Sequence, residues 1–452
     1  MADINNPLRP PVRTLAEQIY GYLADDEDAR VCKDIPDSAC SEQPLAFSCQ
    51  LVANTLTQIG DALSSPKLVL AWMLSSIGAP AYFIAMLVPV RESLSLLPQL
   101  FVAQRIREQP RRKYFWVWGS IGQGVSLLMM LPVVLLFDGL IAGVLVILLL
   151  SLFSLSRGVC SVAYKDVLGK TVSKTRRGRL SGSASSAAGL VTLAVALCLL
   201  AAPYLAIFKG LEQGSTIFLV LLLAAAILWF LAALVYRAVP EVAGATEGGG
   251  NAFAEAIRSL ALLRDDARFR DFVIARALLV STAFSIPYIV VLIQRSGAGD
   301  LGSLGTLMLA DGAAGLLSGM IWGRLSDQYS NRVMAFAGAI SVVVMLTAVA
   351  LYTWKGWLSL LPVSACVLFS AAVAHQGARV ARKTYLVDMA ASGNRAQYTA
   401  VSNTVIGLFL LAGGGLGVID TLYGTVHVLL LLAGIGLLGV VRSLQLPNVQ
   451  AE

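Results

Sequence analysis

Charged side chains are scarce in this sequence of 452 residues. Asp, Glu, Lys and Arg together make up 13% of it, against about 25% in soluble globular domains. The mean hydropathy is +0.74 and 57% of the residues are apolar, which excludes an ordinary water-soluble domain. A lipid bilayer suits this composition. Because one helical crossing needs about 20 mostly apolar residues, the chain is long enough for roughly a dozen crossings.

Motifs of metal sites and enzymes are also missing. None of the six cysteines forms a CxxC pair, and neither histidine lies near Cys32 or Cys40, so we expect free thiols and no metal site. The sequence contains no phosphate-binding glycine loop and no nucleophile beside a recognisable base. Residues 1–46 lack the apolar run of a cleavable signal peptide. We therefore expect no enzyme activity and no cofactor.

Long apolar runs predict an all-α integral membrane protein with twelve transmembrane helices. A first helix that starts near Phe47 and breaks at Gly78-Ala79-Pro80 leaves room for a second crossing, which a start near Lys67 would not. The predicted helices lie near 47–77, 81–105, 114–137, 139–163, 179–206, 215–237, 270–294, 301–323, 332–354, 357–379, 396–418 and 424–441.

The basic residues are distributed asymmetrically along these helices. Most of the 34 Lys and Arg residues fall in the N-terminal segment, in alternate loops and in the tail, and only Lys209, Arg295 and Lys355 fall in the opposite loops. The positive-inside rule then predicts a multi-pass protein of the cell membrane with both termini in the cytoplasm. The net charge of +7 is explained by topology and lipid contact, so we expect no binding of nucleic acid.

The sequence divides into two similar halves. We expect a cytoplasmic extension (1–46), a six-helix bundle (47–237), a polar cytoplasmic linker (238–269), a second six-helix bundle (270–441) and a cytoplasmic tail (442–452). One shift of 219 residues places Glu92 on Asp311, Gly158 on Gly377 and Arg176 on Arg395. Agreement at one shift in separate helices and loops predicts a parallel duplication, with a pseudo-twofold axis along the membrane normal.

The loop G-R-L-S-D-Q-Y-S-N-R at 323–332 carries a family resemblance. It is similar to the signature G-x-L-(A/S)-D-R-x-G-(R/K)-(R/K) of the major facilitator superfamily, although Gln328, Ser330 and Asn331 depart from it. In the first half only Glu108, Arg112 and Lys113 keep the order of acid then base. With the topology, the resemblance covers residues 47–441 and implies a secondary carrier. The fifth helix lacks the G-P-x-x-G-G pattern of many drug/proton antiporters, which argues against a multidrug carrier. The matching residues are Gly323, Leu325, Ser326, Asp327 and Arg332.

Charged residues inside the predicted helices are the candidate functional groups, because a charge at bilayer depth costs at least a few kcal/mol. The first helix carries a polar stripe at helical spacing, and facilitator proteins often have a Gly-Asp pair where this chain has Gly60-Asp61. The stripe either lines a water-filled cavity or hydrogen-bonds a neighbouring helix. The charged candidates are Asp61, Lys67, Arg91, Glu92, Arg157, Arg276 and Asp311, and the stripe consists of Asn54, Gln58, Asp61 and Ser65.

The acids at equivalent positions suggest a shared role. Glu92 and Asp311 each precede a loop arginine by 13 residues, which places them about 20 Å from the cytoplasmic loop. Two interpretations are open. Glu92 and Asp311 form structural ion pairs, or one of the three acids Asp61, Glu92 and Asp311 gains and loses a proton during transport. Arg157 binds an anion or a carboxylate, with an ion pair to Asp61 or Glu92 as the structural alternative.

The resemblance to facilitator proteins also implies candidate site residues in the fourth and tenth predicted helices. These relatives often place an arginine before a Q-G pair, a pattern split here between Arg157-Gly158 and Gln376-Gly377. His375, beside Gln376, either titrates near neutral pH or makes a hydrogen-bonded helix contact. The small-residue stretches 182–189 and 411–417 predict close helix packing.

A second group of charged residues is predicted to form a gate on the cytoplasmic side. Carboxylates there can lie at helix N-termini and pair with loop arginines while the inner side is closed. The gate residues are Arg105, Glu108, Arg176, Gly323, Arg324, Asp327, Arg332 and Arg395.

The sequence therefore predicts secondary active transport of a small solute by alternating access. In the absence of a nucleotide site, we expect coupling to protons and function as a monomer. The competing hypothesis is a non-transporting receptor or assembly factor built on a carrier fold.

Overall fold

The computed structural model of the chain describes residues 15–21, 37–96, 106, 108–201, 216–243, 260–297, 301–354, 356–389 and 395–449. Within these ranges the regular structure is helical, and no strand occurs. The all-α class is therefore as predicted.

The first half begins with a broken helix. The prediction of one helix over 47–77 is corrected here, because α3 ends at Leu63 and α4 starts at Val69. Pro66 explains the break, since it has no N–H to donate and restricts the residue before it. The helices of this half are α2 (Asp37–Ser41), α3 (Gln43–Leu63), α4 (Val69–Ser76), α5 (Ala81–Leu96), α7 (Lys113–Leu136), α8 (Gly139–Thr171), α9 (Lys174–Ala201) and α10 (Thr216–Arg237).

The second half contains the same kind of interruptions. The eighth and ninth predicted helices join in α15, whose backbone leaves the helical region at Tyr329 (φ −145°, ψ 58°), inside the signature loop. The seventh and eleventh predicted helices are each divided in two. The helices are α12 (Leu262–Asp265), α13 (Ala267–Leu278), α14 (Ser281–Arg295), α15 (Leu301–Thr353), the 3-10 helix η3 (Trp357–Ser359), α16 (Leu361–Met389), α17 (Arg395–Gly413), α18 (Leu416–Tyr423) and α19 (Thr425–Gln445).

The lengths of these helices fit a bilayer. In the described part of the chain, nine helical segments are long and apolar enough to cross a membrane. The pair α3 and α4, helix α5 and the first part of α15 occupy the remaining three predicted crossings. Large apolar side chains also face outward, among them Trp118, Leu136 and Leu317, which are 70%, 72% and 63% exposed. A lipid environment would cover them.

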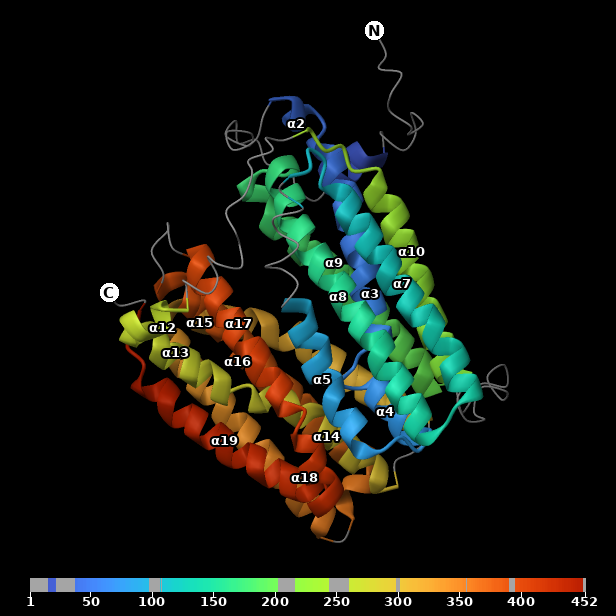
Figure 1. Ribbon diagram of the computed structural model, residues 1–452, viewed down its shortest axis with the longest axis vertical. Coiled ribbons are helices and arrows are strands. Elements are labelled where there is room, and N and C mark those ends of the chain that lie inside the picture. Colours follow the sequence, from blue (N-terminus) through green and yellow to red (C-terminus); the bar gives the residue numbers. More distant parts are fainter. Residues whose placement is uncertain are drawn as a thin grey trace.

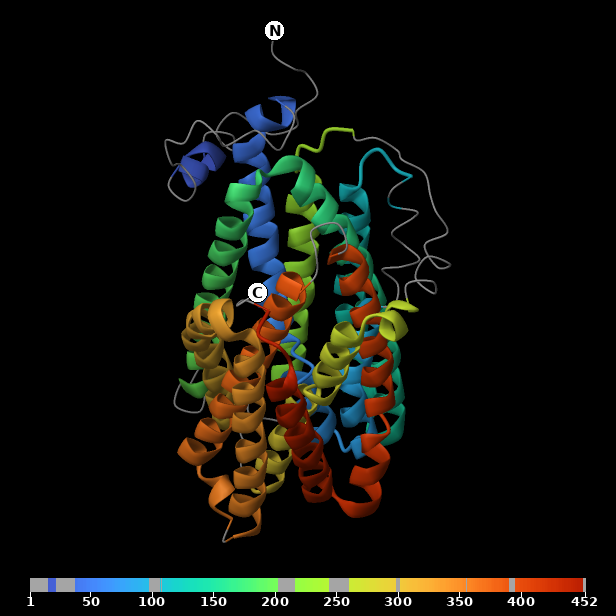
Figure 2. The ribbon, with the colours of Figure 1, turned by 90° about the vertical axis from the view of Figure 1, so that its left-hand side faces the viewer.

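The helices form two groups that meet along α5 and α9. Figure 1 shows α3, α7, α8, α9 and α10 on one side and α13, α16, α17 and α19 on the other, with α4, α5 and α14 between them. Viewed after a 90° turn, the helices of both groups run along the long axis of the molecule (Figure 2). Across the boundary, the Ser93 hydroxyl donates a hydrogen bond of 2.8 Å to the carbonyl of Gly407.

Glycines allow the two groups to approach closely. A side chain at Gly417 would lie 2.5 Å from the Cα of Tyr82, and one at Gly189 would lie 2.9 Å from Leu316. A side chain at Gly305 would collide with the backbone of α9 near Leu200. The prediction that 182–189 and 411–417 serve close packing is therefore confirmed at Gly189 and Gly417, whereas Gly182 has no neighbour among the described residues that a side chain would meet.

Equivalent loops in the two halves make equivalent contacts. The Lys113 ammonium donates to the carbonyls of Arg237 (3.0 Å) and Val239 (2.7 Å), just after α10. In the second half, the Asn331 amide donates to the carbonyl of Leu446 (2.8 Å), just after α19. Each loop thus holds the chain that leaves the last helix of its own half, as expected of a duplication.

Part of the N-terminal extension packs against the first half. The Ser48 hydroxyl donates to the carbonyl of Ala16 (2.9 Å), and the Tyr20 ring contacts Phe47 edge-on at 5.4 Å between centroids. The expectation of free thiols is wrong at Cys40, which is disulfide-bonded. Four other cysteines are free, namely Cys49, Cys160, Cys198 and Cys366.

Candidate functional site

Asp61 lies between two arginines from different helices. In the last turn of α3, its carboxylate accepts hydrogen bonds from Arg91 of α5 at 2.7 Å and from Arg157 of α8 at 2.5 and 2.6 Å. The side chains of Arg91, Asp61 and Arg157 are 8%, 23% and 37% exposed. Arg91 also lies over the ring of Phe153, 4.5 Å from its centroid. The ion-pair alternative for Arg157 is thus present in the structure, and Arg157 is the most accessible of the three groups.

A second contact joins the two halves directly. The Lys67 nitrogen lies 2.8 Å from Nε2 of His375 in α16, and Nδ1 of His375 lies 3.3 Å from the Thr282 hydroxyl. An ammonium group can only donate, so Nε2 accepts and the proton of a neutral imidazole resides on Nδ1. Lys67 reaches this position because it lies in the break between α3 and α4.

Glu92 and Asp311 face the region between the two halves. Both are exposed although they lie inside membrane-spanning helices. Glu92 is within electrostatic range of Lys67 and of Arg382 in α16, and Asp311 is within range of Lys67 and of Arg379. Because these cations come from both halves, the two carboxylates point toward the boundary and not toward acyl chains. Water can therefore reach this part of the protein.

Two cations of the site were not among the predicted residues. Arg379 and Arg382 follow His375 at i+4 and i+7, so they lie on the same face of α16. That spacing from His375 could have identified them as site residues in the sequence. However, both arginines lie near residue 379, where the predicted helix ends, and basic residues at such a position are usually ordinary cytoplasmic charges. We call the whole set the central charge cluster: Asp61, Lys67, Arg91, Glu92, Arg157, Asp311, His375, Arg379 and Arg382.

Asn54 and Arg276, two further predicted residues, make structural contacts. The Asn54 amide donates to the Tyr164 hydroxyl of α8 at 3.0 Å, which is the helix-contact alternative for the polar stripe. Gln58 is half-buried, and so is Gln376, whose amide nitrogen lies near Gly315. Arg276 is buried and donates to Ser402 (2.5 Å) and to Asn403 of α17 (2.9 Å), inside the second half.

The family assignment follows from the sequence profile of the Major Facilitator Superfamily, which matches residues 44–414. The chain belongs to this superfamily. It is therefore a multi-pass membrane transporter, and its partners include the lipid bilayer and a small-molecule substrate.

Solved structures confirm the facilitator fold. A POT family transporter in complex with 5-aminolevulinic acid has a TM-score of 0.66 and 11% identity, covering 89% of this chain and 96% of that one. The nucleoside transporter NupG has a TM-score of 0.62 and 13% identity, covering 89% and 98%. The xylose transporter XylE from E. coli, in an inward-open conformation, has a TM-score of 0.63 and 11% identity, covering 89% and 96%. No curated protein sequence matches the chain.

The charged residues of the superfamily signature loop are exposed in this facilitator. Asp327 and Arg324 are exposed, and Arg332, also exposed, lies over the ring of Tyr329, 5.0 Å from its centroid. Within the described residues, Asp327 has no ion-pair partner. Of the other predicted gate residues, Gly323 lies inside α15, Glu108 is exposed and Arg176 is buried. Arg105 and the side chain of Arg395 lie outside the described residues.

An ion network that the sequence did not reveal lies at the same end of the first half. Arg112 pairs with Asp166, and Lys170 lies 3.2 Å from Asp166 and 3.6 Å from the fully buried carboxylate of Glu241. That carboxylate also accepts hydrogen bonds from the backbone N–H groups of Arg112 (2.9 Å) and Lys113 (2.8 Å). Glu241 follows α10 in the polar linker, where a buried acid has no local sequence signal.

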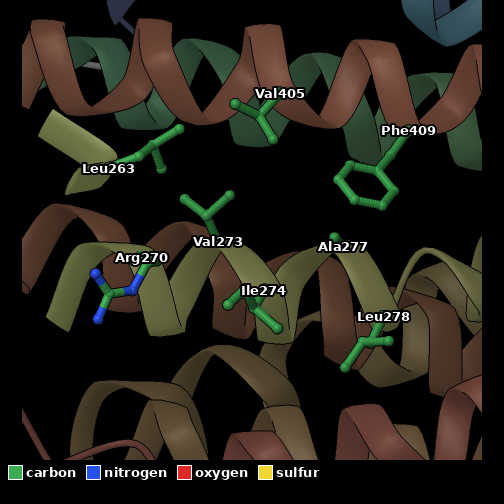
Figure 3. Close-up of a pocket in the computed structure, with 8 residues that line it drawn as sticks. All are labelled: Leu263, Arg270, Val273, Ile274, Ala277, Leu278, Val405 and Phe409. Atoms are coloured by element: carbon green, nitrogen blue, oxygen red, sulfur yellow. The ribbon is translucent and has the colours of Figure 1, made fainter. Parts of the chain in front are cut away.

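A pocket of about 220 Å³ lies apart from the central charge cluster. Figure 3 shows it between α13 and α17, with Arg270 as its single charged lining residue. The pocket offers apolar surface and few groups that could orient a polar solute. It is lined by Leu263, Arg270, Val273, Ile274, Ala277, Leu278, Val405 and Phe409.

Proposed function

We propose that this facilitator is a proton-coupled secondary active transporter that moves a small solute by alternating access. In this proposal it works without enzymatic chemistry, as a monomer in the cell membrane, with both termini in the cytoplasm. The moving units are residues 47–237 and 270–441, joined by the linker 238–269. The observation that carries the proposal is the carboxylate of Asp61 held by Arg91 and Arg157, beside the Lys67–His375 contact between the halves.

Charged groups at this depth suit a transporter better than a receptor with a packed centre. Intramembrane charges are rare and mark solute or ion routes. Glu92 and Asp311 are exposed between the halves, and Arg157 retains 37% of its side-chain surface. A dry, closed centre would leave none of these groups accessible, so the receptor or assembly-factor alternative gains no support from them.

Proton coupling is proposed through the pair of Asp61 and Arg157. Arg91 is nearly buried, whereas Arg157 is the more accessible guanidinium. Protonation of Asp61 would remove the charge that holds Arg157 and free it to pair with Glu92 or with a solute. A step of this kind links the protonation state to the arrangement of α3, α5 and α8, which is the coupling that alternating access requires.

The test uses proteoliposomes that enclose a pH-sensitive dye. We expect addition of a transported solute to produce a proton flux in the wild type. Asp61→Asn should reduce this flux by at least about tenfold, because the switchable charge is gone. Glu92→Gln and Asp311→Asn are tested in parallel. Asp271→Asn, an exposed acid on α13, is the matched control and should behave like the wild type. Undiminished solute-driven proton flux in all three site variants would refute coupling through these carboxylates.

A further inference from the structure

The central charge cluster contains more positive than negative charge. Its five cationic side chains face three carboxylates, and His375 is uncharged while it accepts a hydrogen bond from Lys67. Two positive charges are therefore in excess. The cations are Lys67, Arg91, Arg157, Arg379 and Arg382, and the carboxylates are Asp61, Glu92 and Asp311.

The excess is one positive charge in each half, and the arginines that lack a direct partner lie in α16 of the second half. In the first half, Arg91 and Arg157 share Asp61. In the part of the chain that the structure describes, neither Arg379 nor Arg382 has a hydrogen bond or an ion pair to a side chain. Asp311 and Glu92 interact with them only through space, so both guanidinium groups remain free to bind an anion directly.

The two arginines are positioned to meet a solute between the halves. Arg379 is exposed and Arg382 is half-buried, so both remain accessible. Both lie on the α16 face of His375, which touches Lys67 of the first half, and Arg382 interacts electrostatically with Glu92 of α5. A guanidinium group presents two parallel N–H donors that match the oxygens of a carboxylate or phosphate.

We propose that the substrate is a small organic or inorganic oxyanion, bound through a carboxylate or phosphate group by Arg379 and Arg382 of the second half and by Arg157 of the first. The proposal rests on the transport function above and names its substrate class. On binding, the anion supplies the counter-charge missing from α16. It also competes with Asp61 for Arg157, which connects substrate binding to the pair proposed for proton coupling.

The test measures the melting temperature of the purified full-length protein with succinate, inorganic phosphate, xylose or putrescine at equal ionic strength. A bound ligand raises this temperature as its concentration exceeds Kd. We expect stabilisation by succinate or phosphate, and no stabilisation by neutral xylose or cationic putrescine. The stronger of the two anions distinguishes a carboxylate site from a phosphate site.

Substitutions then assign the effect to α16. Arg379→Gln and Arg382→Gln should each weaken anion binding by about tenfold or more, and the double variant should abolish the stabilisation. Arg379→Lys keeps the charge and should retain part of the binding. Arg442→Gln removes an exposed arginine in the last turn of α19 and should leave binding unchanged. If the Gln variants do not fold, mass spectrometry of the wild type should find both arginines protected from phenylglyoxal by the anion.

Several outcomes overturn the proposal. The first is that neither anion stabilises the protein, or that only xylose or putrescine does. The second is that the stabilisation by an anion persists in the double variant. The third is that the anion stabilises the protein but does not protect the two arginines from phenylglyoxal. If the protein binds the anion but does not transport it, the result is different. In that case anion binding depends on Arg379 and Arg382, but sealed proteoliposomes take up no succinate or phosphate.

Discussion

The carboxylate of Asp61 compensates two guanidinium groups at once, and this determines what its removal does. Replacing one member of a buried ion pair is strongly destabilising because the other charge loses its partner. Arg91 is 8% exposed, whereas Arg157 is 37% exposed and can be hydrated when its partner is lost. The two arginines should therefore respond differently to substitution although they bind the same acid.

Arg91→Gln is expected to destabilise the protein more than Arg157→Gln. For Arg91→Gln we expect the unfolding free energy to fall by up to about 3 kcal/mol. This is the low end of the loss seen when one partner of a buried ion pair is removed, because Asp61 is itself 23% exposed. Combining Arg91→Gln with Asp61→Asn should recover part of the loss, since it removes a charge together with its partner. Denaturation of the single and double variants measures the coupling. Strictly additive effects would contradict a shared ion pair.

The candidate residues could be predicted from the sequence, but their partners could not. Asp61, Glu92 and Asp311 were identifiable because any charge inside an apolar run stands out. Which cation meets which acid depends on helix packing, and residues as distant in sequence as Lys67 and His375 meet only after folding. Arg379 and Arg382 were missed because they lie near a predicted helix end, where basic residues are common.

Among the helices, α13 starts at an acidic cap. The Asp266 carboxylate accepts hydrogen bonds from the backbone N–H of Phe269 (2.9 Å) and from the Tyr398 hydroxyl of α17 (2.7 Å). Burial raises the pKa of Asp266, but these hydrogen bonds outweigh burial and hold the pKa below its usual value. The cap thus joins the start of α13 to α17 through a charged group that lies before the membrane-spanning segment.

Asp266→Ala is expected to lower the melting temperature, because loss of an N-cap costs about 1 kcal/mol. The pKa in the folded protein is lower than in the unfolded chain, about 3.9, so the stabilisation is complete above that pH. It is lost as the pH falls through the folded-state pKa. Asp266→Asn keeps an acceptor and should lie between the alanine variant and the wild type. Thermal unfolding at neutral pH that is identical for wild type and Asp266→Ala would refute the cap.

Helix positions were predictable because apolar length is a strong signal in membrane proteins. Helix interruptions were harder. The sequence predicts the first break at Gly78-Ala79-Pro80, whereas α3 already ends at Leu63, ahead of Pro66. The turn between α17 and α18, around Gly414 and Gly415, lies inside the single helix predicted over 396–418. Such breaks depend on contacts with neighbouring helices, and hydropathy does not report them.

For the whole molecule, we propose that the two bundles move against each other around one charged site. The glycine contacts of α5 with α18 and of α9 with α15 lie along the boundary between them. Glu108 and Gln328 are exposed at equivalent loops of the two halves, and Asp138 and Trp354 are exposed at helix ends on the opposite side. If the bundles rock, the separations across these two pairs change in opposite directions.

Spin labels on those two pairs, in a cysteine-free background, report this motion. Distances are measured by pulsed electron paramagnetic resonance in lipid discs, across a range of pH and in wild-type and Asp61→Asn backgrounds. Alternating access predicts two distances for each pair, with the 108–328 pair becoming shorter as the 138–354 pair becomes longer, and with Asp61→Asn changing the two populations. A single unchanged distance for both pairs under every condition would contradict alternating access.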